Sequence, residues 1–558
     1  MVSRIIRIVN KEISGLHEAA YLLAFFAILS QLLALVRDKL LANAFGAGNV
    51  LDIYYAAFRL PDLLYVCVVS IVSATVIMPF LIEKFEVGEG EGKNFANQVF
   101  SFFFLMLVIS SLVCFAFAPS LMRYFFRGFE EGKMELLITA TRILLLSPIF
   151  LGISNFFGSL TQMKKRFVVY AVSPLVYNIG IIIGIVFLYP TLGVKGLFWG
   201  VILGALLHMG IQIPLIHSSG LLPKFTLHFK TSEIWNVVKV SIPRTLTISS
   251  TQISSFFLVS MASLFQSGSV AVFNLGLNLQ SVPLTIVGVS YSSAVFPVLS
   301  KYFVEKNKES FLARMIESTK HIIFWSFPIT ILFVVLRAQI VRTIYGAGNF
   351  DWSDTRLTAA ALAIFILSSA AQCLMLLFVR SYYAEGRTKV PFFYNLFSSA
   401  LTIALAYFAL ILFNAFPVLL YFLEEIFKVS GEEGTRVLIL PLAYSVGVII
   451  NLILHWVQFE RDYRGFTRNV LRSVFQIFSA SIIMGYVTFI SLRFFDNLFS
   501  LEKAIGVFMQ GLLSGVTGIV AFLIVLKLLR NAEIAEMWTA LHHRIWKSKI
   551  VVPDQEVL

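Results

Sequence analysis

Charged residues are scarce in this chain, at 13% of its 558 residues, and no stretch has the composition of a soluble domain. Cysteine is rarer still. Cys67, Cys114 and Cys373 lie in apolar segments, without the spacing of metal ligands or of a disulfide framework. The sequence also lacks a Walker loop, a metal-binding His-Glu pattern and a nucleophile elbow. We therefore expect no metal site and no enzymatic activity.

Apolar side chains, in contrast, are abundant. The hydrophobic fraction is 58% and the mean hydropathy is +0.84. Soluble domains have roughly 45–50% apolar residues. A chain of this length with that bias is expected to be an integral membrane protein with many spans.

The net charge of +13 could indicate a nucleic-acid partner, but the distribution of the basic residues argues against one. Lysine and arginine gather in alternate short loops, for example at 164–166 and 461–468. This is the positive-inside pattern of membrane proteins. We expect a multi-pass protein of the plasma membrane with both termini on the cytoplasmic side.

Hydropathy and turn signals predict an all-α polytopic fold with fourteen transmembrane helices. The expected spans cover residues 19–43, 53–82, 97–121, 136–161, 167–189, 195–217, 234–262, 269–299, 320–344, 356–384, 389–413, 437–459, 471–493 and 504–528. Residues 1–18 are expected to form an interfacial helix on the cytoplasmic surface, and residues 529–558 a basic cytoplasmic tail.

An internal repeat runs through the first twelve spans. Pro79 matches Pro297 and Asn178 matches Asn395, each within a similar local sequence and at a nearly constant offset. Six spans fit in one period, and an even number returns the chain to the same side, so the two halves have the same orientation. Two such bundles can enclose a cavity that opens alternately to the two sides of the membrane.

The repeat divides the chain into lobes. We expect an N-lobe of spans 1–6 at 19–217 and a C-lobe of spans 7–12 at 234–459. Spans 13 and 14, at 471–528, fall outside the repeat.

Charges inside the first two spans identify candidate functional residues. Arg37 and Asp38 lie within the first span, and Arg59 lies beside Pro61 in the second. An ionisable residue in a bilayer is costly unless it faces a wet cavity or a partner, so it marks a functional site. The alternative is that Arg37 and Arg59 are anchors that extend to the membrane interface. Asp52 is seven residues before Arg59, so two helical turns are expected to place both on one face of the second span.

These residues carry a resemblance to a known family. The run from Arg37-Asp38 through Phe45-Gly46 to Pro61, together with the stretch 345–362, resembles the MurJ/MviN lipid II flippases. The resemblance implies transport of lipid II to the outer leaflet of the bacterial inner membrane during cell-wall synthesis. It also implies two six-helix lobes around a V-shaped cavity, with spans 13 and 14 forming a groove for the lipid tail.

The resemblance also implies roles for individual residues. Arg37 and Arg59 would contact the pyrophosphate of the lipid, while Asp38 and Asp52 would orient those arginines or gate the cavity. Gln31 stands where the family often has an arginine, and another neutral residue, Asn278, replaces its arginine in span 8.

Neutral donors remain useful in such a cavity. Gln31, Asn278 and Gln280 can each hydrogen-bond a sugar or a phosphate. Pro61 and Pro283 are expected to act as hinges in spans 2 and 8.

Three other functions stay open at this point. The cargo could be another polyprenyl-diphosphate-linked glycan, the chain could be a cation-coupled multidrug exporter, or it could be a non-transporting scaffold for cell-wall enzymes. We expect no cofactor. The driving force, whether membrane potential or an ion, is left open by the sequence, as is contact with cell-wall synthesis enzymes.

Overall fold

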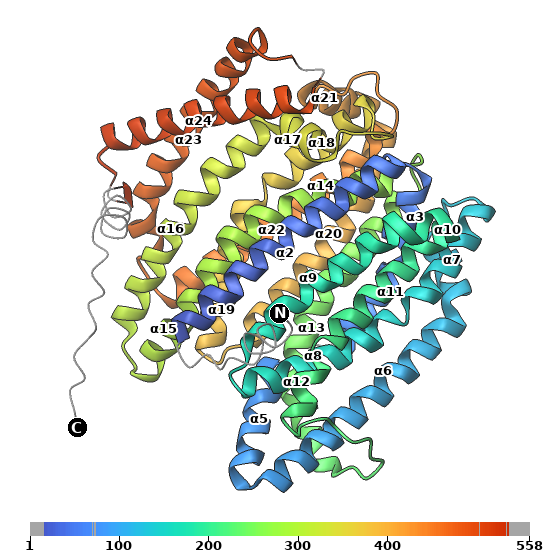
Figure 1. Cartoon of the computed structure of the whole chain (residues 1–558). Helices are drawn as coiled ribbons and strands as arrows, with labels where there is room; N and C mark the ends of the chain where they lie inside the picture. The colour runs from blue at the N-terminus through green and yellow to red at the C-terminus, as the bar shows by residue number, and fades with distance from the viewer. Residues whose placement is uncertain (1–15, 70, 72–73, 501–502, 532, 535–558) are drawn as a thin grey trace, which may run out of the picture. The chain divides into compact units, whose positions relative to one another are not determined.

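The computed structural model of the chain consists of helices and the turns that connect them (Figure 1). It describes residues 16–69, 71, 74–500, 503–531 and 533–534. The predicted interfacial helix at 1–18 and basic tail at 529–558 lie largely outside the described residues. Apolar side chains recur along most helices without a polar face, as expected for helices surrounded by protein or lipid.

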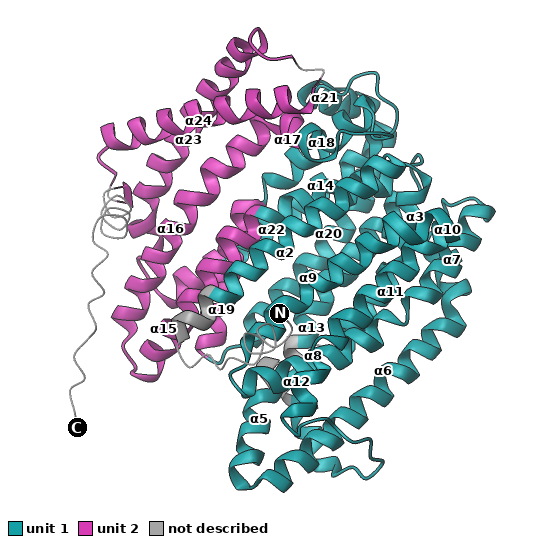
Figure 2. Cartoon of the chain, viewed as in Figure 1, with its two compact units in different colours: residues 1–282, 341–368, 386–455 teal, residues 283–340, 369–385, 456–558 magenta. Residues whose placement is uncertain are grey.

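The helices group into two compact units, shown in Figure 2. Unit 1 comprises residues 1–282, 341–368 and 386–455, so it includes segments of both predicted lobes. Its first helices are α2 (Leu16–Phe45), α3 (Asn49–Ala57), α4 (Arg59–Val69), α5 (Ala74–Val87), α6 (Glu89–Phe125), α7 (Glu131–Leu144), α8 (Ser147–Met163), α9 (Phe167–Ile183), η2 (Gly184–Leu188), α10 (Tyr189–Leu192), α11 (Val194–Gly210) and α12 (Ile213–Ser218). The later ones are α13 (Thr231–Ala262), α18 (Trp352–Ile366), α20 (Lys389–Ala415), α21 (Pro417–Phe427) and η4 (Thr435–Leu438).

Unit 2 comprises residues 283–340, 369–385 and 456–558. Its helices are η3 (Leu284–Val289), α15 (Ser290–Val304), α16 (Lys308–Val335), α19 (Ser369–Ala384), α23 (Phe466–Asp496) and α24 (Ala504–Leu528). Three helices continue from one unit into the other: α14 (Ser269–Pro283), α17 (Arg337–Tyr345) and α22 (Ile439–Asp462).

Eleven helical segments of the described chain are long and apolar enough to cross a membrane. They correspond to the predicted spans other than the first, second and seventh. α2 and α13 occupy the first and seventh positions as helices of 30 and 32 residues. The second position holds α3, α4 and α5, of 9, 11 and 14 residues, in place of one continuous helix. The chain is therefore an all-helical, multi-pass membrane protein.

The predicted ninth span, 320–344, is wrong in its boundaries. α16 begins at Lys308, because the Asn307 side chain caps it by accepting a hydrogen bond of 2.9 Å from the backbone amide of Ser310. It ends at Val335, and the separate helix α17 follows. The helix at this position therefore begins before the predicted span begins and ends before that span ends.

The two predicted hinge prolines lie close to junctions between helical segments. Pro61 is in the first turn of α4, directly after the break at Phe58 that ends α3. A proline fits a first turn because its missing N–H has no helical partner there. Pro283 ends α14, and the π-helix η3 follows it. Such wide turns often accompany functional sites in helices.

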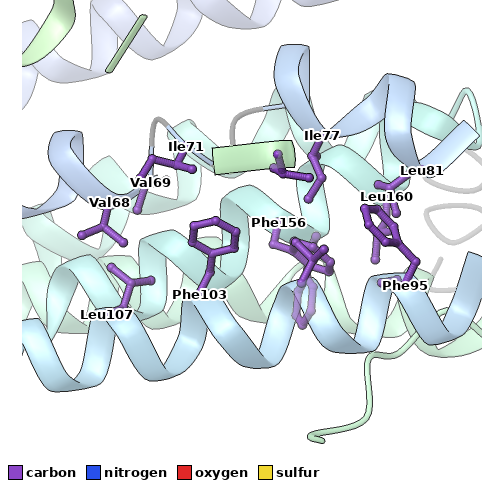
Figure 3. Close-up of a cluster of buried hydrophobic side chains, with 14 of the residues drawn as sticks. Val68, Val69, Ile71, Ile77, Leu81, Phe95, Phe103, Leu107, Phe156 and Leu160 are labelled. Carbon is purple, nitrogen blue, oxygen red and sulfur yellow. The ribbon is translucent and has the colours of Figure 1, made fainter. Parts of the chain in front are cut away.

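Two kinds of packing hold the first part of unit 1 together. Figure 3 shows buried side chains from α4, α5, α6 and α8, including Phe103, Leu107 and Phe156. α9 and α11 instead approach through glycines, since a Cβ at Gly180 would overlap the backbone of Gly204. Small residues permit such close helix contacts in membranes, where burial from lipid gives little driving force. This contact positions the polar residues of α9.

Candidate functional site

Arg37 and Asp38, near the end of α2, form a largely buried ion pair. Arg37 Nε and Nη2 donate to Asp38 Oδ1 at 2.9 and 2.7 Å. The Asp38 side chain is 3% exposed and that of Arg37 is 19% exposed. The pair neutralises its own charge within apolar helices, and part of the Arg37 side chain stays exposed.

Asn178 of α9 holds the other side of this guanidinium. Its side-chain oxygen accepts from Arg37 Nη1 at 3.0 Å, while its amide nitrogen donates to the Pro174 carbonyl at 3.1 Å. Arg37 is therefore fixed from two helices, α2 and α9.

The neutral residues of α14 extend the same contacts. Asn278 Nδ2 donates to Asp38 Oδ2 at 3.0 Å. Gln31 Nε2 lies 3.4 Å from Ser281 Oγ, to which it donates. Both residues are partly exposed. Gln280 is 1% exposed and donates to Ser368 Oγ at 3.5 Å, so its amide is engaged inside the protein.

Arg59, the first residue of α4, reaches toward α13 and α14. Its Nη1 donates to Ser255 Oγ at 3.0 Å and its Nη2 donates to Asn274 Oδ1. Its Nε is buried and has no hydrogen-bond partner within the described part of the chain. A buried donor without a partner is costly, so this guanidinium has capacity for a further acceptor.

Asp52 of α3 makes a second buried ion pair. Its Oδ2 lies 2.8 Å from Lys133 Nζ, and the two side chains are 2% and 14% exposed. The same carboxylate accepts from the backbone amides of Gly268 and Ala271, at 2.8 and 2.9 Å. These amides are at the beginning of α14, where unpaired N–H groups favour a negative charge.

Backbone contacts between loops surround these pairs. Ala47 N donates to Asp354 Oδ2 at 2.9 Å, and Asn349 N donates to the Asn43 carbonyl at 2.9 Å. Gly268 and Gly348 have positive φ, and a Cβ at either would overlap the facing backbone. Glycine is therefore required for the loops to come this close.

Unit 1 thus contains most of the predicted site residues: Gln31, Arg37, Asp38, Asp52, Arg59, Pro61, Asn278 and Gln280. Arg37, Asp38 and Asn278 form one connected group, and Gln31 contacts Ser281 on the same helix as Asn278. Asp52 and Arg59 make separate contacts with α14 and its preceding loop. Pro283 belongs to unit 2.

Sequence reasoning missed the partners Asn178, Asn274, Ser255 and Lys133. The asparagines carried a usable signal, because each is a strongly polar residue within an apolar helix. Asn178 and Asn274 are buried, at 5% and 3% exposure. Lys133 gave no such signal, since a lysine at the beginning of a span is ordinary.

The chemistry available is anion binding by guanidinium groups. Arg37 and Arg59 are partly exposed, and each is held by at least one neutral side-chain oxygen. An arginine offers several donors in a planar fork that matches phosphate oxygens. Among the described residues, no group of three or more His, Cys, Asp or Glu side chains could hold a metal ion.

Comparison with known proteins gives a family match. The family model described as lipid II flippase MurJ matches residues 41–508. The chain is 26% identical to a probable lipid II flippase MurJ of Rickettsia prowazekii over 391 residues, which cover 69% of this chain and 76% of that protein. It is 23% identical to a probable lipid II flippase MurJ of Buchnera aphidicola subsp. Acyrthosiphon pisum over 505 residues, covering 88% and 94%.

Solved structures show the same fold. A structure of lipid II flippase MurJ in an inward closed conformation superimposes with a TM-score of 0.73, at 22% identity, over 92% of this chain and all of that one. An inward-facing multidrug resistance MATE family transporter of the MOP superfamily gives a TM-score of 0.62 at 13% identity, over 79% and 96%.

Proposed function

Because the chain belongs to the lipid II flippase MurJ family, with its function in peptidoglycan synthesis, we propose that it moves lipid II from the inner to the outer leaflet of the bacterial plasma membrane. The family match over residues 41–508 is the observation that carries this proposal. Transport requires no covalent chemistry, and the chain is a transporter and not an enzyme.

The eleven apolar helices are part of a larger arrangement in this proposal. α2, the segment α3–α5 and α13 complete a set of fourteen spans. Residues 19–217 and 234–459 form two parallel six-helix lobes around a V-shaped cavity. Spans 13 and 14, at 471–528, receive the lipid tail. Both termini are cytoplasmic, which follows from the positive-inside pattern.

In this mechanism Arg37 and Arg59 bind the pyrophosphate. Each charge-assisted hydrogen bond to a phosphate oxygen contributes about 1.5–3 kcal/mol. Arg37 gives up its hydrogen bonds to Asp38 and bonds the pyrophosphate instead. Asn278 and Gln31 donate further hydrogen bonds to the substrate from neutral side chains. Asp38 then keeps Asn278 as its partner, so the carboxylate is not left without a hydrogen bond. Gln280 has a supporting role, because it is buried against Ser368.

Asp52 serves as a gating residue in this proposal. Its bonds to Lys133, Gly268 and Ala271 join α3 to α7 and to the beginning of α14. Opening of the cavity to the outer side breaks these bonds, and closing restores them. Pro61 and Pro283, each close to a junction between helical segments, allow the attached helices to move separately.

Complementation tests the proposal. The gene is expressed in a bacterium depleted of its own lipid II flippase, and growth and cell shape are followed. We expect the wild-type chain to restore growth and Arg37→Ala to fail, with both proteins at equal levels in the membrane. Normal membrane levels without any rescue by the wild-type chain would contradict the proposal.

A second cargo has one observation in its favour. Gln31 and Asn278 are neutral where the resemblance to the family implies arginines, so the site has less positive charge. A polyprenyl-diphosphate glycan without acidic groups would suit such a site. Rescue of a strain that lacks an exporter of such a glycan, without rescue of the flippase-depleted strain, would favour this alternative.

A further inference from the structure

The short helix α21 exposes apolar side chains and turns an acidic one toward the protein. Val418, Phe422 and Ile426 recur every four residues, so they share one face of the helix. They are 73%, 66% and 54% exposed. On the other side of the helix, Leu423 and Glu424 are buried. This is the reverse of a helix on the surface of a soluble protein, where the charged residue faces water and the apolar face is covered.

Hydrogen bonds fix the buried side of α21 to the chain that follows it. Glu424 Oε1 accepts from Thr435 Oγ1 at 2.5 Å, and both residues are buried. The Glu424 carbonyl accepts from the backbone amide of Val429 at 2.9 Å, and Val429 is fully buried. Rotation of the helix would leave buried polar groups without partners, which is costly. The apolar face therefore cannot turn inward.

Residues 428–434, which we call the strap, tie α21 to two other elements of unit 1. Glu432 forms an ion pair with Arg356 of α18. Glu433 Oε2 accepts from Gln266 Nε2 at 2.6 Å, and Gln266 lies in the loop before α14. α18, α20, α21 and this loop all belong to unit 1 (Figure 2). The helix is thus held in place on the protein with its apolar face outward.

The exposed face of α21 adjoins the exposed face of α20. α20 is one of the spans that are apolar enough to cross a membrane, and little of its apolar stretch is buried in the protein. Near its end, Tyr407, Phe408 and Ile411 are all more than half exposed. Apolar side chains that a membrane span exposes face lipid. Only Phe416, itself 59% exposed, separates the two helices, so the apolar face of α21 begins where the lipid-facing surface of α20 ends.

The length of α21 and the edge of its apolar face suit the boundary between lipid and water. Eleven residues are too few to span a bilayer, which takes about 20. Tyr421 and Glu425, four residues apart, form the neighbouring exposed row of the helix. Glu425 Oε1 accepts from Ser430 Oγ of the strap at 2.9 Å. Tyrosine is enriched at membrane–water interfaces, and the polar edge of an interfacial helix stays hydrated at the headgroups.

From these observations we infer that α21 is an interfacial helix, whose face of Val418, Phe422 and Ile426 lies in the lipid of the leaflet where α20 ends. Such helices bury their apolar face about 5–10 Å into the boundary between headgroups and acyl chains. The partner is bilayer phospholipid without a requirement for anionic headgroups, because α21 contains no basic residue. Through the strap, this contact holds α18 and the loop before α14 at a fixed level relative to that leaflet. The inference is independent of the lipid that is transported.

The test uses the full-length protein in liposomes of phosphatidylcholine, with its three native cysteines replaced by alanine. A nitroxide label is attached to one new cysteine at a time, in Val418→Cys, Phe422→Cys or Ser430→Cys. Collisions of the label with oxygen, which concentrates in lipid, and with a water-soluble nickel chelate are measured by electron paramagnetic resonance. We expect labels at 418 and 422 to collide more with oxygen, and the control label at 430, on the strap, to collide more with the chelate.

A substitution tests whether the apolar face itself holds α21 in the lipid. In protein labelled at Val418→Cys, we expect Phe422→Glu to abolish the preference for oxygen, because a carboxylate is costly in hydrocarbon. Phe422→Leu is the matched control and should keep the preference. The Phe422 side chain is exposed, so neither change disturbs the packing of α21 against the protein. If Phe422→Glu does not insert into the membrane, the labels in protein that retains Phe422 decide the question.

Three outcomes would overturn the inference. Labels at 418 and 422 that collide mainly with the chelate would place the face in water. Labels that collide with neither reagent would show that protein covers the face, as in contact with a second copy of the chain. An unchanged preference for oxygen in Phe422→Glu would show that the apolar face does not hold the helix in lipid. None of these outcomes bears on complementation of the flippase-depleted strain, so the proposed function would still stand.

Discussion

Asn278 donates to the carboxylate of Asp38 at 3.0 Å, although 240 residues separate the two in sequence. The contact joins α2 to α14, and it supplies Asp38 with a neutral partner in addition to Arg37. Because the second partner is neutral, the charge of Asp38 is balanced by Arg37 alone within this group. The kind of side chain at position 278 therefore determines the net charge around the proposed pyrophosphate site.

Substitution of Asn278 tests this balance. In Asn278→Asp two carboxylates would face each other, and two like charges 4 Å apart repel by about 4 kcal/mol at an effective dielectric of 20. We expect a lower unfolding temperature and loss of complementation. Asn278→Arg should remain functional, because it offers Asp38 a charged donor. Equal behaviour of the two variants would show that charge at this position is unimportant.

The Asp52–Lys133 pair should contribute strongly to stability. Removal of one partner of a buried ion pair costs about 3–5 kcal/mol, since the other charge stays buried. We expect Asp52→Ala to lower the unfolding temperature of the purified protein markedly. The double variant, with Asp52→Ala and Lys133→Ala, should lose less stability than the sum of the losses in the two single variants.

An exposed pair provides the control for that experiment. Arg123 and Glu131 lie 2.7 Å apart, but their side chains are 55% and 70% exposed. Exposed pairs contribute about 0–1 kcal/mol, so Glu131→Ala should change stability little. If Asp52→Ala and Glu131→Ala have similar effects, Asp52 does not hold α3 to the beginning of α14.

Gly268 should tolerate no side chain. Its φ of +92° is unfavourable for other residues, and an added Cβ would overlap the Ala47 carbonyl. Gly386 is the matched control, with a φ of +73° and nothing within 4 Å of an added Cβ. We expect Gly386→Ala to lower the free energy of unfolding by about 1–2 kcal/mol, because alanine would have to adopt a left-handed backbone conformation there. Gly268→Ala should unfold at a lower temperature than Gly386→Ala, and the reverse order would contradict the close approach of the loops.

Topology offers a further prediction. The distribution of basic residues places both termini in the cytoplasm and the loop containing α21 outside. A reporter fused after residue 425 should therefore be active only outside the cell, and one at the C-terminus only inside. Reporters on the same side would exclude the arrangement of fourteen spans.

Much of the fold could be predicted from sequence because apolar length is a strong signal. The eleven spans that were both predicted and found are long runs with few charges. The other three positions are less uniformly apolar or less continuous. The first contains Arg37 and Asp38, the second is divided where α3 ends before Phe58, and the seventh contains the serine- and threonine-rich stretch of α13. A helix that serves a polar site cannot be uniformly apolar, so hydropathy is weakest where function is concentrated.

The site was predictable only in part. Arg37 and Asp38 are adjacent in sequence, and their pairing is a local event. Asp52, in contrast, has Lys133 as its ionic partner, 81 residues away, and that pairing depends on how α3 packs against α7. α3 also ends at Ala57 and α4 begins at Arg59, so Asp52 and Arg59 belong to separate helical segments, and their partners lie on different elements.

The most direct test of the account is transport of lipid II by the purified protein in liposomes. Lipid II and a polyprenyl diphosphate carrying a glycan without peptide are each supplied on one leaflet, and their appearance on the other is measured. The account predicts movement of lipid II by the wild type and by the control Arg493→Ala, partial movement by Arg37→Lys and Arg59→Lys, and none by Arg37→Ala or Arg59→Ala. Arg493 suits this control because it is exposed at the end of α23 and stacks on Phe489. Unimpaired lipid II movement by both alanine variants, or movement of the peptide-free glycan lipid alone, would contradict it.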